Sequence, residues 1–241
     1  YGFVIWDRAQ KKLFGARDIF GIKPFYYAKM NGCFLFGSEI KSFVEHPKFD
    51  KILNEDALGT YLSFQFVPTN ETFFKGVFCL QPGHYFTYQD GELEITRYFE
   101  PHFSGDTEKS FEEIVDEVEK TMKESVAAHK ISDVEVGSYL SSGVDSSYMA
   151  YLGQVDRTFT VGFGEEKYSE IRDAKEFAKS INMKNDSKII EPDEYWDCLS
   201  DAMYYMDEPV ADPAAIALYF LSKEAAKKVK DAIKDAVKKA D

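Results

Sequence analysis

The hydrophobic pattern of this chain changes once, between residues 101 and 110. Before that point, short aromatic and β-branched runs are broken by Gly, Asn, Asp and Pro, which is typical of antiparallel β structure. After it, apolar residues recur at helical spacing and then in short runs that alternate with helical stretches. Because alternating strands and helices form βαβ units, this second part is expected to build a parallel sheet. The predicted fold class is α+β followed by α/β.

Two hairpins are predicted in the first part of the chain. Asn31-Gly32 and Asp90-Gly91 each separate two β-rich runs, and both dipeptides tolerate the positive φ values of a tight turn. The four strands that they join are expected over residues 24–29, 33–36, 84–88 and 93–98. A short helix is expected over residues 55–62.

A long helix is predicted over residues 111–129, and Ser110 with Glu113 has the spacing of a capping box at its start. Further strands are expected over residues 134–140, 158–163 and 187–190, and further helices near 145–153, 169–182 and 192–206. After Ser222 the sequence is almost entirely Ala, Lys and acids, which predicts one amphipathic helix. The apolar positions of this helix are Val229, Ile233 and Val237. Asp235 and Lys239 are spaced to form an ion pair on it.

Composition excludes several classes of function. With 29 Lys and Arg against 42 Asp and Glu, the net charge of −13 disfavours nucleic acid as a main partner. The longest apolar stretch, Ala214–Leu221, is far shorter than the roughly 20 residues that span a bilayer, so no membrane partner is expected. The cysteines lack both paired and metal-ligand spacing, which favours a cytoplasmic location; they are Cys33, Cys79 and Cys198.

The strongest chemical signal is the segment Val136–Ser147, in which an apolar strand runs directly into a Ser- and Gly-rich loop that opens a helix. Backbone N–H groups at a helix N-terminus favour an anion, and small side chains let a pyrophosphate approach the backbone. Asp145 would repel a bare phosphate, so it predicts a Mg²⁺ ion that bridges its carboxylate and phosphate oxygens. Further donors are the hydroxyls of Ser141, Ser142, Ser146 and Ser147. An ordinary helix cap is the alternative, because Ser, Asp and Gly all favour helix starts.

The loop itself, Ser-Ser-Gly-Val-Asp-Ser-Ser over Ser141–Ser147, resembles the pyrophosphate loop of the ATP-pyrophosphatase group, which is usually Ser-Gly-Gly-x-Asp-Ser. It differs from the Walker loop, which needs a Lys before Ser or Thr. Ser142 stands where Gly is usual. Its hydroxymethyl group narrows the approach of a phosphate slightly but can also donate a hydrogen bond.

Blocks in the first part of the chain resemble the later part of a class II glutamine amidotransferase domain joined to an asparagine synthetase. They occur in the family's order, and they are Arg17–Tyr27, Phe36–Lys41, Tyr61–Pro68 and Leu80–Tyr85. Met206–Pro213 extends the likeness, which covers most of positions 1–222. Together with the loop, these blocks are similar to the glutamine-hydrolysing asparagine synthetases of bacteria.

This resemblance implies a division of the chain. Residues 1–100 would be the C-terminal part of an N-terminal-nucleophile type, antiparallel β-rich glutaminase domain, and residues 101–110 a linker. Residues 111–230 would be a truncated adenine-nucleotide alpha-hydrolase-like (ATP-pyrophosphatase) domain with a parallel sheet. Residues 231–241 would be a helical tail foreign to the family.

The resemblance also implies a reaction. ATP and Mg²⁺ would activate the side-chain carboxylate of aspartate as an acyl adenylate, and ammonia from glutamine would then give asparagine. The pyrophosphate portion would lie on Ser141–Ser147, the metal on Asp145 and the adenosine against Leu140 and Val161. The expected nucleotide-binding residues are therefore Leu140, Ser141, Ser142, Gly143, Val144, Asp145, Ser146, Ser147 and Val161. The partners implied are these small molecules, and a homodimer is left open.

Two features of that family are missing from these residues. The chain opens at Tyr1, inside an apolar run, where class II amidotransferases use an N-terminal cysteine as nucleophile. A second signature, Ser-Gly-Glu-Gly-Ala-Asp-Glu, is replaced by the helix expected over residues 231–241. No catalytic residue is therefore assigned, and the chain is expected to be a fragment that is inactive alone. A β-lactam synthetase-like relative and a catalytically dead nucleotide-binding or interaction module are the alternatives.

Other candidates support weaker interpretations. Arg17-Asp18 and Glu39–Lys41 fit either substrate contacts or charge pairs that support the fold. Asp207-Glu208-Pro209 fits a place near an aspartate pocket or a helix-ending loop before Pro. Cys198 is interpreted as a core residue. The histidines are interpreted as structural or surface residues: His46, His84, His102 and His129.

Overall fold

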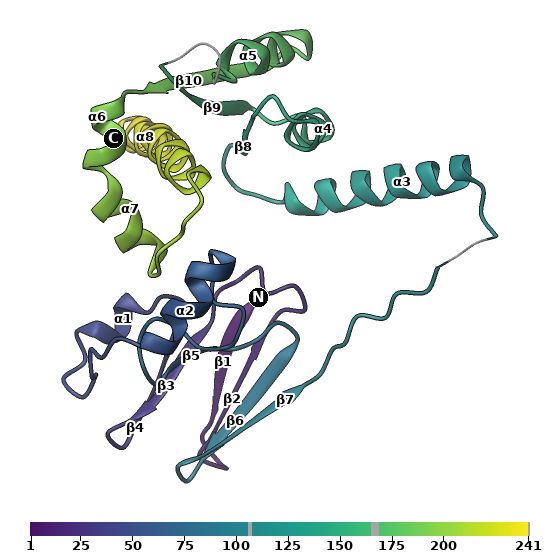
Figure 1. Cartoon of the computed structure of the whole chain (residues 1–241). Coiled ribbons are helices and arrows are strands. Elements are labelled where there is room, and N and C mark those ends of the chain that lie inside the picture. Colours follow the sequence, from purple (N-terminus) through teal and green to yellow (C-terminus); the bar gives the residue numbers. More distant parts are fainter. Residues whose placement is uncertain (106–107, 165–168, 241) are drawn as a thin grey trace. The chain divides into compact units, whose positions relative to one another are not determined.

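The computed structural model describes residues 1–105, 108–164 and 169–240, with the exception of the side chains of residues 229–240 (Figure 1). Two compact units make up the chain. Unit 1 consists of residues 1–104 and 203–212, and unit 2 of the described residues of 105–202 and 213–241. Unit 1 therefore contains a short segment that comes from far along the sequence.

Unit 1 holds two antiparallel sheets, as the sequence predicts. The first has the strand order β1-β2-β6-β7, and its strands are Gly2–Asp7, Lys12–Arg17, His84–Gln89 and Glu92–Arg97. The second has the order β4-β3-β5, with strands Cys33–Gly37, Tyr26–Met30 and Val77–Cys79. Two helices accompany them, α1 (Lys41–Val44) and α2 (Glu55–Phe64).

Both predicted hairpins are confirmed, as β3–β4 and β6–β7. Their turn residues have positive φ, 51° and 74° at Asn31 and Gly32, and 51° and 85° at Asp90 and Gly91. Two successive residues with positive φ match the twist of the flanking strands, which explains why these dipeptides mark the turns. Helix α2 also confirms the prediction for residues 55–62 and extends two residues beyond it, to Phe64.

One of the core clusters of unit 1 joins its two sheets, and a second surrounds Phe43 of α1. Phe86 from the first sheet packs with Phe25, Tyr27 and Leu80, and all four side chains are buried. A Cβ at Gly15 would overlap the ring of Phe86, so glycine is required at this crossing. Truncating a buried phenylalanine of this kind to alanine costs about 3–5 kcal/mol. The sheets are thus held together largely by aromatic packing.

Unit 2 contains a parallel sheet, as the alternating pattern predicts. Its strand order is β10-β9-β8, from Lys184–Ile190, Arg157–Phe163 and Gly137–Tyr139. Its helices are α3 (Phe111–His129), α4 (Val144–Gly153), α5 (Ile171–Ser180), α6 (Pro192–Asp197) and α8 (Ala214–Ala240), and α7 (Leu199–Met206) enters unit 1 at Met203. Helix α5 packs on β9 and β10, and α8 packs on β9. Buried Leu140, Ala150, Ala174 and Ala178 form a core among these elements.

Helix α3 has the predicted bounds and the predicted capping box. Ser110 Oγ accepts a hydrogen bond from the Glu113 N–H at 3.2 Å, and Glu113 Oε2 accepts one from the Ser110 N–H at 2.8 Å. These bonds from Ser110 hold the pKa of Glu113 below its usual value. The local sequence signal was therefore sufficient for this helix.

Several predicted elements have other bounds than those observed; for example, the strand expected over residues 187–190 begins at Lys184. The strand expected over residues 134–140 is shorter, because the Val136 N–H donates to Asp156 Oδ2 at 3.0 Å rather than to a neighbouring strand. The helix expected over residues 192–206 is two helices, α6 and α7, and α6 has its own capping box between Glu191 and Glu194. The predicted tail helix begins earlier, at Ala214. The side chains of its predicted stripe and ion pair lie outside the described residues.

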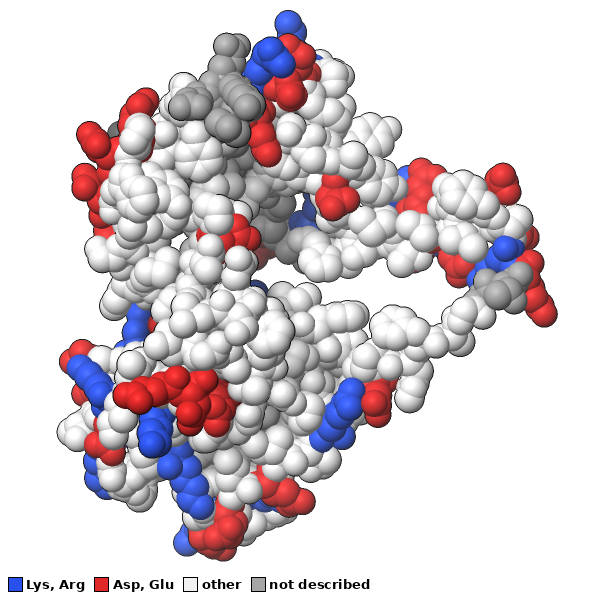
Figure 2. All heavy atoms as spheres, in the orientation of Figure 1, with Lys and Arg blue, Asp and Glu red and all other residues white. Residues whose placement is uncertain are grey.

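On the face drawn in Figure 2, basic side chains occur in small groups beside acidic ones, and uncharged surface separates these groups. Within the described part of the chain, no helix is long and apolar enough to cross a membrane.

Candidate functional site

The Ser- and Gly-rich loop lies where β8 ends and α4 begins, at the carboxyl end of the parallel strands. Ligands of open α/β sheets bind at this edge. Leu140, the residue after β8, is 2% exposed, and its N–H donates to the Phe159 carbonyl at 2.8 Å. The Leu140 carbonyl accepts a hydrogen bond from Thr160 Oγ1 at 2.8 Å. Both backbone groups of Leu140 are therefore fixed against β9, which gives the loop a rigid start.

Hydroxyl groups fix the shape of the loop. Ser141 Oγ and Ser146 Oγ lie 2.7 Å apart, and Ser146 Oγ also accepts a hydrogen bond from the Ser141 N–H at 3.1 Å. The Gly143 N–H donates to Ser141 Oγ at 3.2 Å. Two of the four predicted serine donors thus hold the loop itself, a role that the sequence alone did not separate from ligand binding.

Gly143 is the N-cap residue of α4 and has no side chain that could cap the helix. A Ser, Asp or Asn at this position would satisfy one of the first N–H groups with its side chain. Glycine is also a common N-cap residue, but it offers these N–H groups no side-chain acceptor. The N-terminus of α4 keeps its partial positive charge available to an anion.

A carboxylate from another element already lies against this loop. Glu170 Oε2 accepts a hydrogen bond from the Ser142 N–H at 3.1 Å, although the two residues are 28 positions apart in the sequence. Glu170 directly precedes α5 and is exposed. The sequence carried no local signal for this contact, because the chain passes through α4 and β9 between the two residues. The contact shows that the loop N–H group can take an anionic oxygen.

Asp145 lies in the first turn of α4 and is exposed. Among the residues that the structure describes, no three His, Cys, Asp or Glu side chains gather into a metal-binding group. A Mg²⁺ ion at Asp145 would therefore complete its coordination with phosphate oxygens and water, the ligands that this ion commonly keeps. Val161 is half-buried on β9, the strand beside Leu140.

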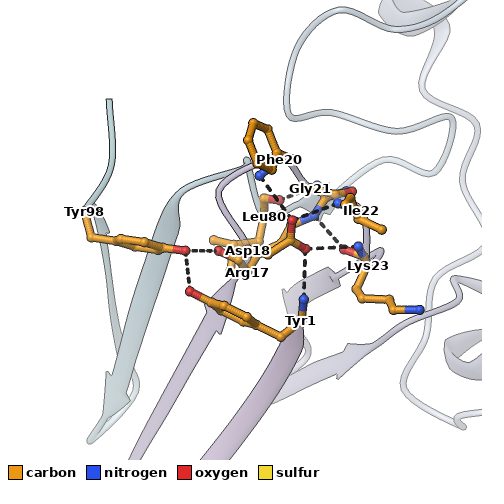
Figure 3. A network of polar contacts seen from close by, with 9 residues as sticks. All are labelled: Tyr1, Arg17, Asp18, Phe20, Gly21, Ile22, Lys23, Leu80 and Tyr98. Carbon is orange, nitrogen blue, oxygen red and sulfur yellow. Dashed lines mark hydrogen bonds and ion pairs between the residues drawn. The ribbon is translucent and has the colours of Figure 1, made fainter. Parts of the chain in front are cut away.

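Arg17 and Asp18, the first candidate pair of unit 1, are engaged by their own loop (Figure 3). The Arg17 guanidinium donates to the carbonyls of Lys23, Gly21 and Leu80 at 2.8, 2.8 and 2.6 Å. Asp18 is buried and accepts from three backbone N–H groups at 3.0–3.1 Å, those of Phe20, Ile22 and Lys23. Burial works to raise the pKa of Asp18, but these hydrogen bonds outweigh it and hold the pKa well below the usual range. The structure favours support of the fold over substrate contact for both residues.

Lys41, the second candidate, forms ion pairs with Glu39 at 3.1 Å and with Asp207 at 2.8 Å. Asp207 directly follows α7, so the helix-ending interpretation of Asp207-Glu208-Pro209 describes its local structure. The carboxylates of Asp207 and Glu208 accept hydrogen bonds from backbone N–H groups within unit 1. Cys198 is buried, as predicted. Three histidines have local ring contacts that fit structural roles: His46 with Lys48, His84 with Pro82 and His129 with Ser125.

Unit 1 also has a hollow of about 540 Å³ that the sequence did not reveal. Asn70, Gln81, His84 and Arg97 line it beside Cys79. Burial raises the pKa of the Cys79 thiol, and an Arg17 nitrogen lies 3.0 Å from its sulfur. None of the residues predicted to bind nucleotide lines this hollow.

Comparison with known proteins identifies relatives of both parts of the chain. A glutamine amidotransferase domain family matches residues 1–99, and an asparagine synthase family matches residues 117–235. Asparagine synthetase [glutamine-hydrolyzing] 1 of Bacillus subtilis (strain 168) is 41% identical over 234 residues, which are 95% of this chain and 37% of that protein. A putative asparagine synthetase [glutamine-hydrolyzing] of Mycobacterium tuberculosis (strain ATCC 25618 / H37Rv) is 38% identical over 241 residues, with the same two coverages of 95% and 37%.

A more distant relative is a putative asparagine synthetase [glutamine-hydrolyzing] 2 of Methanocaldococcus jannaschii, 27% identical over 238 residues, which are 94% of this chain and 46% of that protein. The chain thus spans less than half the length of these relatives. Its two matched regions stand in the order that the sequence blocks predicted. A region similar to glutamine amidotransferase domains is thus followed by one similar to asparagine synthases, and 95% of the chain is similar to a glutamine-hydrolysing asparagine synthetase.

Proposed function

We propose that this chain is part of an ATP-dependent asparagine synthetase. The protein would activate the side-chain carboxylate of aspartate as an acyl adenylate and amidate it with ammonia released from glutamine. The similarity to asparagine synthetases supports the overall reaction, and the glycine-capped N-terminus of α4 supports a nucleotide site in unit 2. The observation that carries the proposal is the loop at the carboxyl edge of the parallel sheet, where glycine caps α4 and the Ser142 N–H donates to a carboxylate oxygen.

The residues of the loop fit a pyrophosphate group. The Ser142 N–H already donates to the Glu170 carboxylate, whose oxygen stands in for a phosphate oxygen. The Ser141–Ser146 contact holds the loop in shape before any ligand arrives. Asp145 would hold Mg²⁺, which would neutralise phosphate charge. Leu140, directly after β8, and Val161, on the neighbouring strand β9, would contact the adenosine.

The division of the chain follows from the same proposal. Residues 1–100 would be the later part of an N-terminal-nucleophile type glutaminase domain, and residues 101–110 the linker. Residues 111–230 would be part of an ATP-pyrophosphatase domain of the adenine-nucleotide alpha-hydrolase-like type, followed by a tail over residues 231–241. The two antiparallel sheets of unit 1 and the parallel sheet of unit 2 support this assignment.

Calorimetric titration of the chain with Mg-ATP tests the site. Asp145→Ala is expected to weaken metal-dependent binding more than threefold, because charge-assisted contacts of this kind are worth about 1.5–3 kcal/mol. Asp193→Ala is the matched control, since Asp193 is also an exposed acid in the first turn of a helix of unit 2, α6. Equal affinities of the wild type and Asp145→Ala would contradict the assignment of Asp145. Absence of Mg-ATP binding to the wild type would contradict the site itself.

A further inference from the structure

The segment of residues 203–212, which we call the strap, belongs to unit 1, although the chain on both sides of it belongs to unit 2. It contains the last residues of α7 and the sequence Asp207-Glu208-Pro209. The proposed nucleotide site uses none of these residues. Its contacts therefore call for a separate explanation.

Asp207 makes the first set of contacts. Its side chain is 6% exposed, and its carboxylate accepts from the backbone N–H groups of Ile40 and Lys41 at 2.7 and 3.3 Å. The Lys41 ammonium lies 2.8 Å from the same carboxylate and 5.4 Å from the ring centroid of Tyr204, also in the strap. Burial works to lower the pKa of Lys41, but its hydrogen bonds with Asp207 and Glu39 outweigh this effect and raise the pKa. The site on unit 1 is thus matched to a carboxylate in both charge and geometry.

Glu208 makes the second set of contacts at a different part of unit 1. Its Oε1 accepts a hydrogen bond from the Phe73 N–H at 2.9 Å. Burial raises the pKa of Glu208, and the neighbouring Asp207 adds to the rise. Both carboxylates are thus withdrawn from solvent. They accept hydrogen bonds from backbone N–H groups in two separate segments of unit 1. A buried carboxylate is costly unless such donors compensate it.

The backbone of the strap turns sharply where α7 ends. Asp207 has a φ of 64°, in the left-handed region that aspartate tolerates better than most residues. A residue in this conformation commonly ends a helix. Here the turn directs the Asp207 carboxylate to Ile40 and Lys41, while Glu208 reaches Phe73. The turn and the two acids act together.

We propose that Asp207 and Glu208 form a latch: they anchor the strap within unit 1, and because the chain on both sides of the strap belongs to unit 2, the two units unfold as one. The chain enters the strap through α7 and returns to unit 2 at Pro213. While the hydrogen bonds of Asp207 and Glu208 are intact, a displacement of either flanking segment is transmitted through them to the segments that contain Ile40 and Phe73. This coupling needs no nucleotide, so it does not depend on the function proposed above.

Native-state hydrogen exchange, read by mass spectrometry across a urea series, tests the latch in the intact chain. Peptides from β6 report on unit 1 and peptides from β9 on unit 2. In the wild type, the buried amides of both strands are expected to open at one common urea concentration. In Asp207→Asn/Glu208→Gln, the two openings are expected to separate, and the Ile40 and Phe73 amides to exchange at least tenfold faster. Asp116→Asn/Glu176→Gln removes the same charge from exposed acids of α3 and α5, and it is expected to behave as the wild type.

Asp207→Asn alone keeps the size of the side chain, and it replaces the double variant in the same experiment if the double variant does not fold. It is expected to give faster exchange at Ile40 and a smaller separation of the two openings. Two results would overturn the proposal: separate openings already in the wild type, or an equal shift of both openings in the latch variants. The second result would mean that Asp207 and Glu208 stabilise the fold without coupling its units.

Discussion

The loop after β2 in unit 1 and the loop after β8 in unit 2 both present backbone N–H groups to a carboxylate, but they obtain that carboxylate differently. In the first loop, Asp18 lies within the loop and takes three N–H groups of its own neighbours. In the second, the cap residue is Gly143, and the carboxylate on Ser142 comes from Glu170, which is distant in sequence and exposed. A loop whose N–H groups bind a buried carboxylate of the same loop is closed to a ligand. A loop whose N–H group binds an exposed carboxylate from another element can exchange that carboxylate for an anionic ligand. This difference separates a loop that is closed to anions from one that could admit an anion, a distinction that composition does not make.

The largest effect is expected from Asp18→Ala, because it leaves three N–H groups of a buried loop without their acceptor and removes the anion beside Arg17. Unit 1 should lose more stability from this substitution than from Asp207→Asn, which keeps the size of its side chain. Asp7→Ala is the matched control: Asp7 also accepts two backbone N–H groups, from Ala9 and Gln10, but in an exposed turn. Urea unfolding followed by circular dichroism measures the losses. Equal losses in Asp18→Ala and Asp7→Ala would contradict the closed-loop interpretation.

The pH dependence of stability provides a second measure of the same loop. Because the pKa of Asp18 is lower in the folded protein than its ordinary value of 3.8, the folded state binds this proton less readily than the unfolded state. Its contribution is complete above the unfolded pKa and is lost as the pH falls through the folded pKa. Asp18→Asn should therefore flatten the acid limb of the stability profile below about pH 4. An unchanged acid limb would show that other carboxyl groups determine it.

A smaller effect, of opposite sign, is expected at the open loop. Glu170→Gln removes the negative charge that occupies the Ser142 N–H, so inorganic pyrophosphate with Mg²⁺ should bind more tightly, by about two- to tenfold for one hydrogen bond exchanged. Glu176→Gln removes an exposed charge from α5 and should leave the affinity unchanged. Isothermal titration calorimetry distinguishes the outcomes. Weaker binding in Glu170→Gln would mean that Glu170 helps to hold the ligand or its metal rather than compete with it.

Local signals determined what the sequence could predict. The two hairpins follow from Asn-Gly and Asp-Gly turns, and α3 follows from its apolar spacing and the Ser110–Glu113 capping box. The contacts that distinguish the candidate site and the strap are long-range: Ser142 and Glu170 are 28 positions apart in the sequence, and Ile40 and Asp207 are 167 positions apart. Turn propensity and periodicity carry no information on such pairs. The sequence therefore located the loop and the Asp207-Glu208 pair but not the groups that each one meets.

The smallest effect is expected from Ser142→Gly, which introduces the residue usual in pyrophosphate loops of this group. The N–H of residue 142, which carries the anion contact, is retained, and the hydroxymethyl group that is removed is exposed. Glycine adds backbone freedom worth roughly 0.5–1 kcal/mol, which offsets the easier approach of a phosphate. Pyrophosphate affinity should therefore change by less than about threefold, since 1.4 kcal/mol corresponds to a factor of ten.

Gly143→Ala provides the contrast at the next position. A Cβ there would lie 3.2 Å from Ser141 Oγ, the acceptor of the Gly143 N–H, so the methyl group presses on the bond that shapes the loop. Its effect on affinity should exceed that of Ser142→Gly in the same titration. The reverse order would indicate that the side chain of residue 142, rather than the backbone held by Ser141, controls access to the N-terminus of α4. The affinity of the loop for an anion would then depend on the size of its side chains and not on its exposed N–H groups.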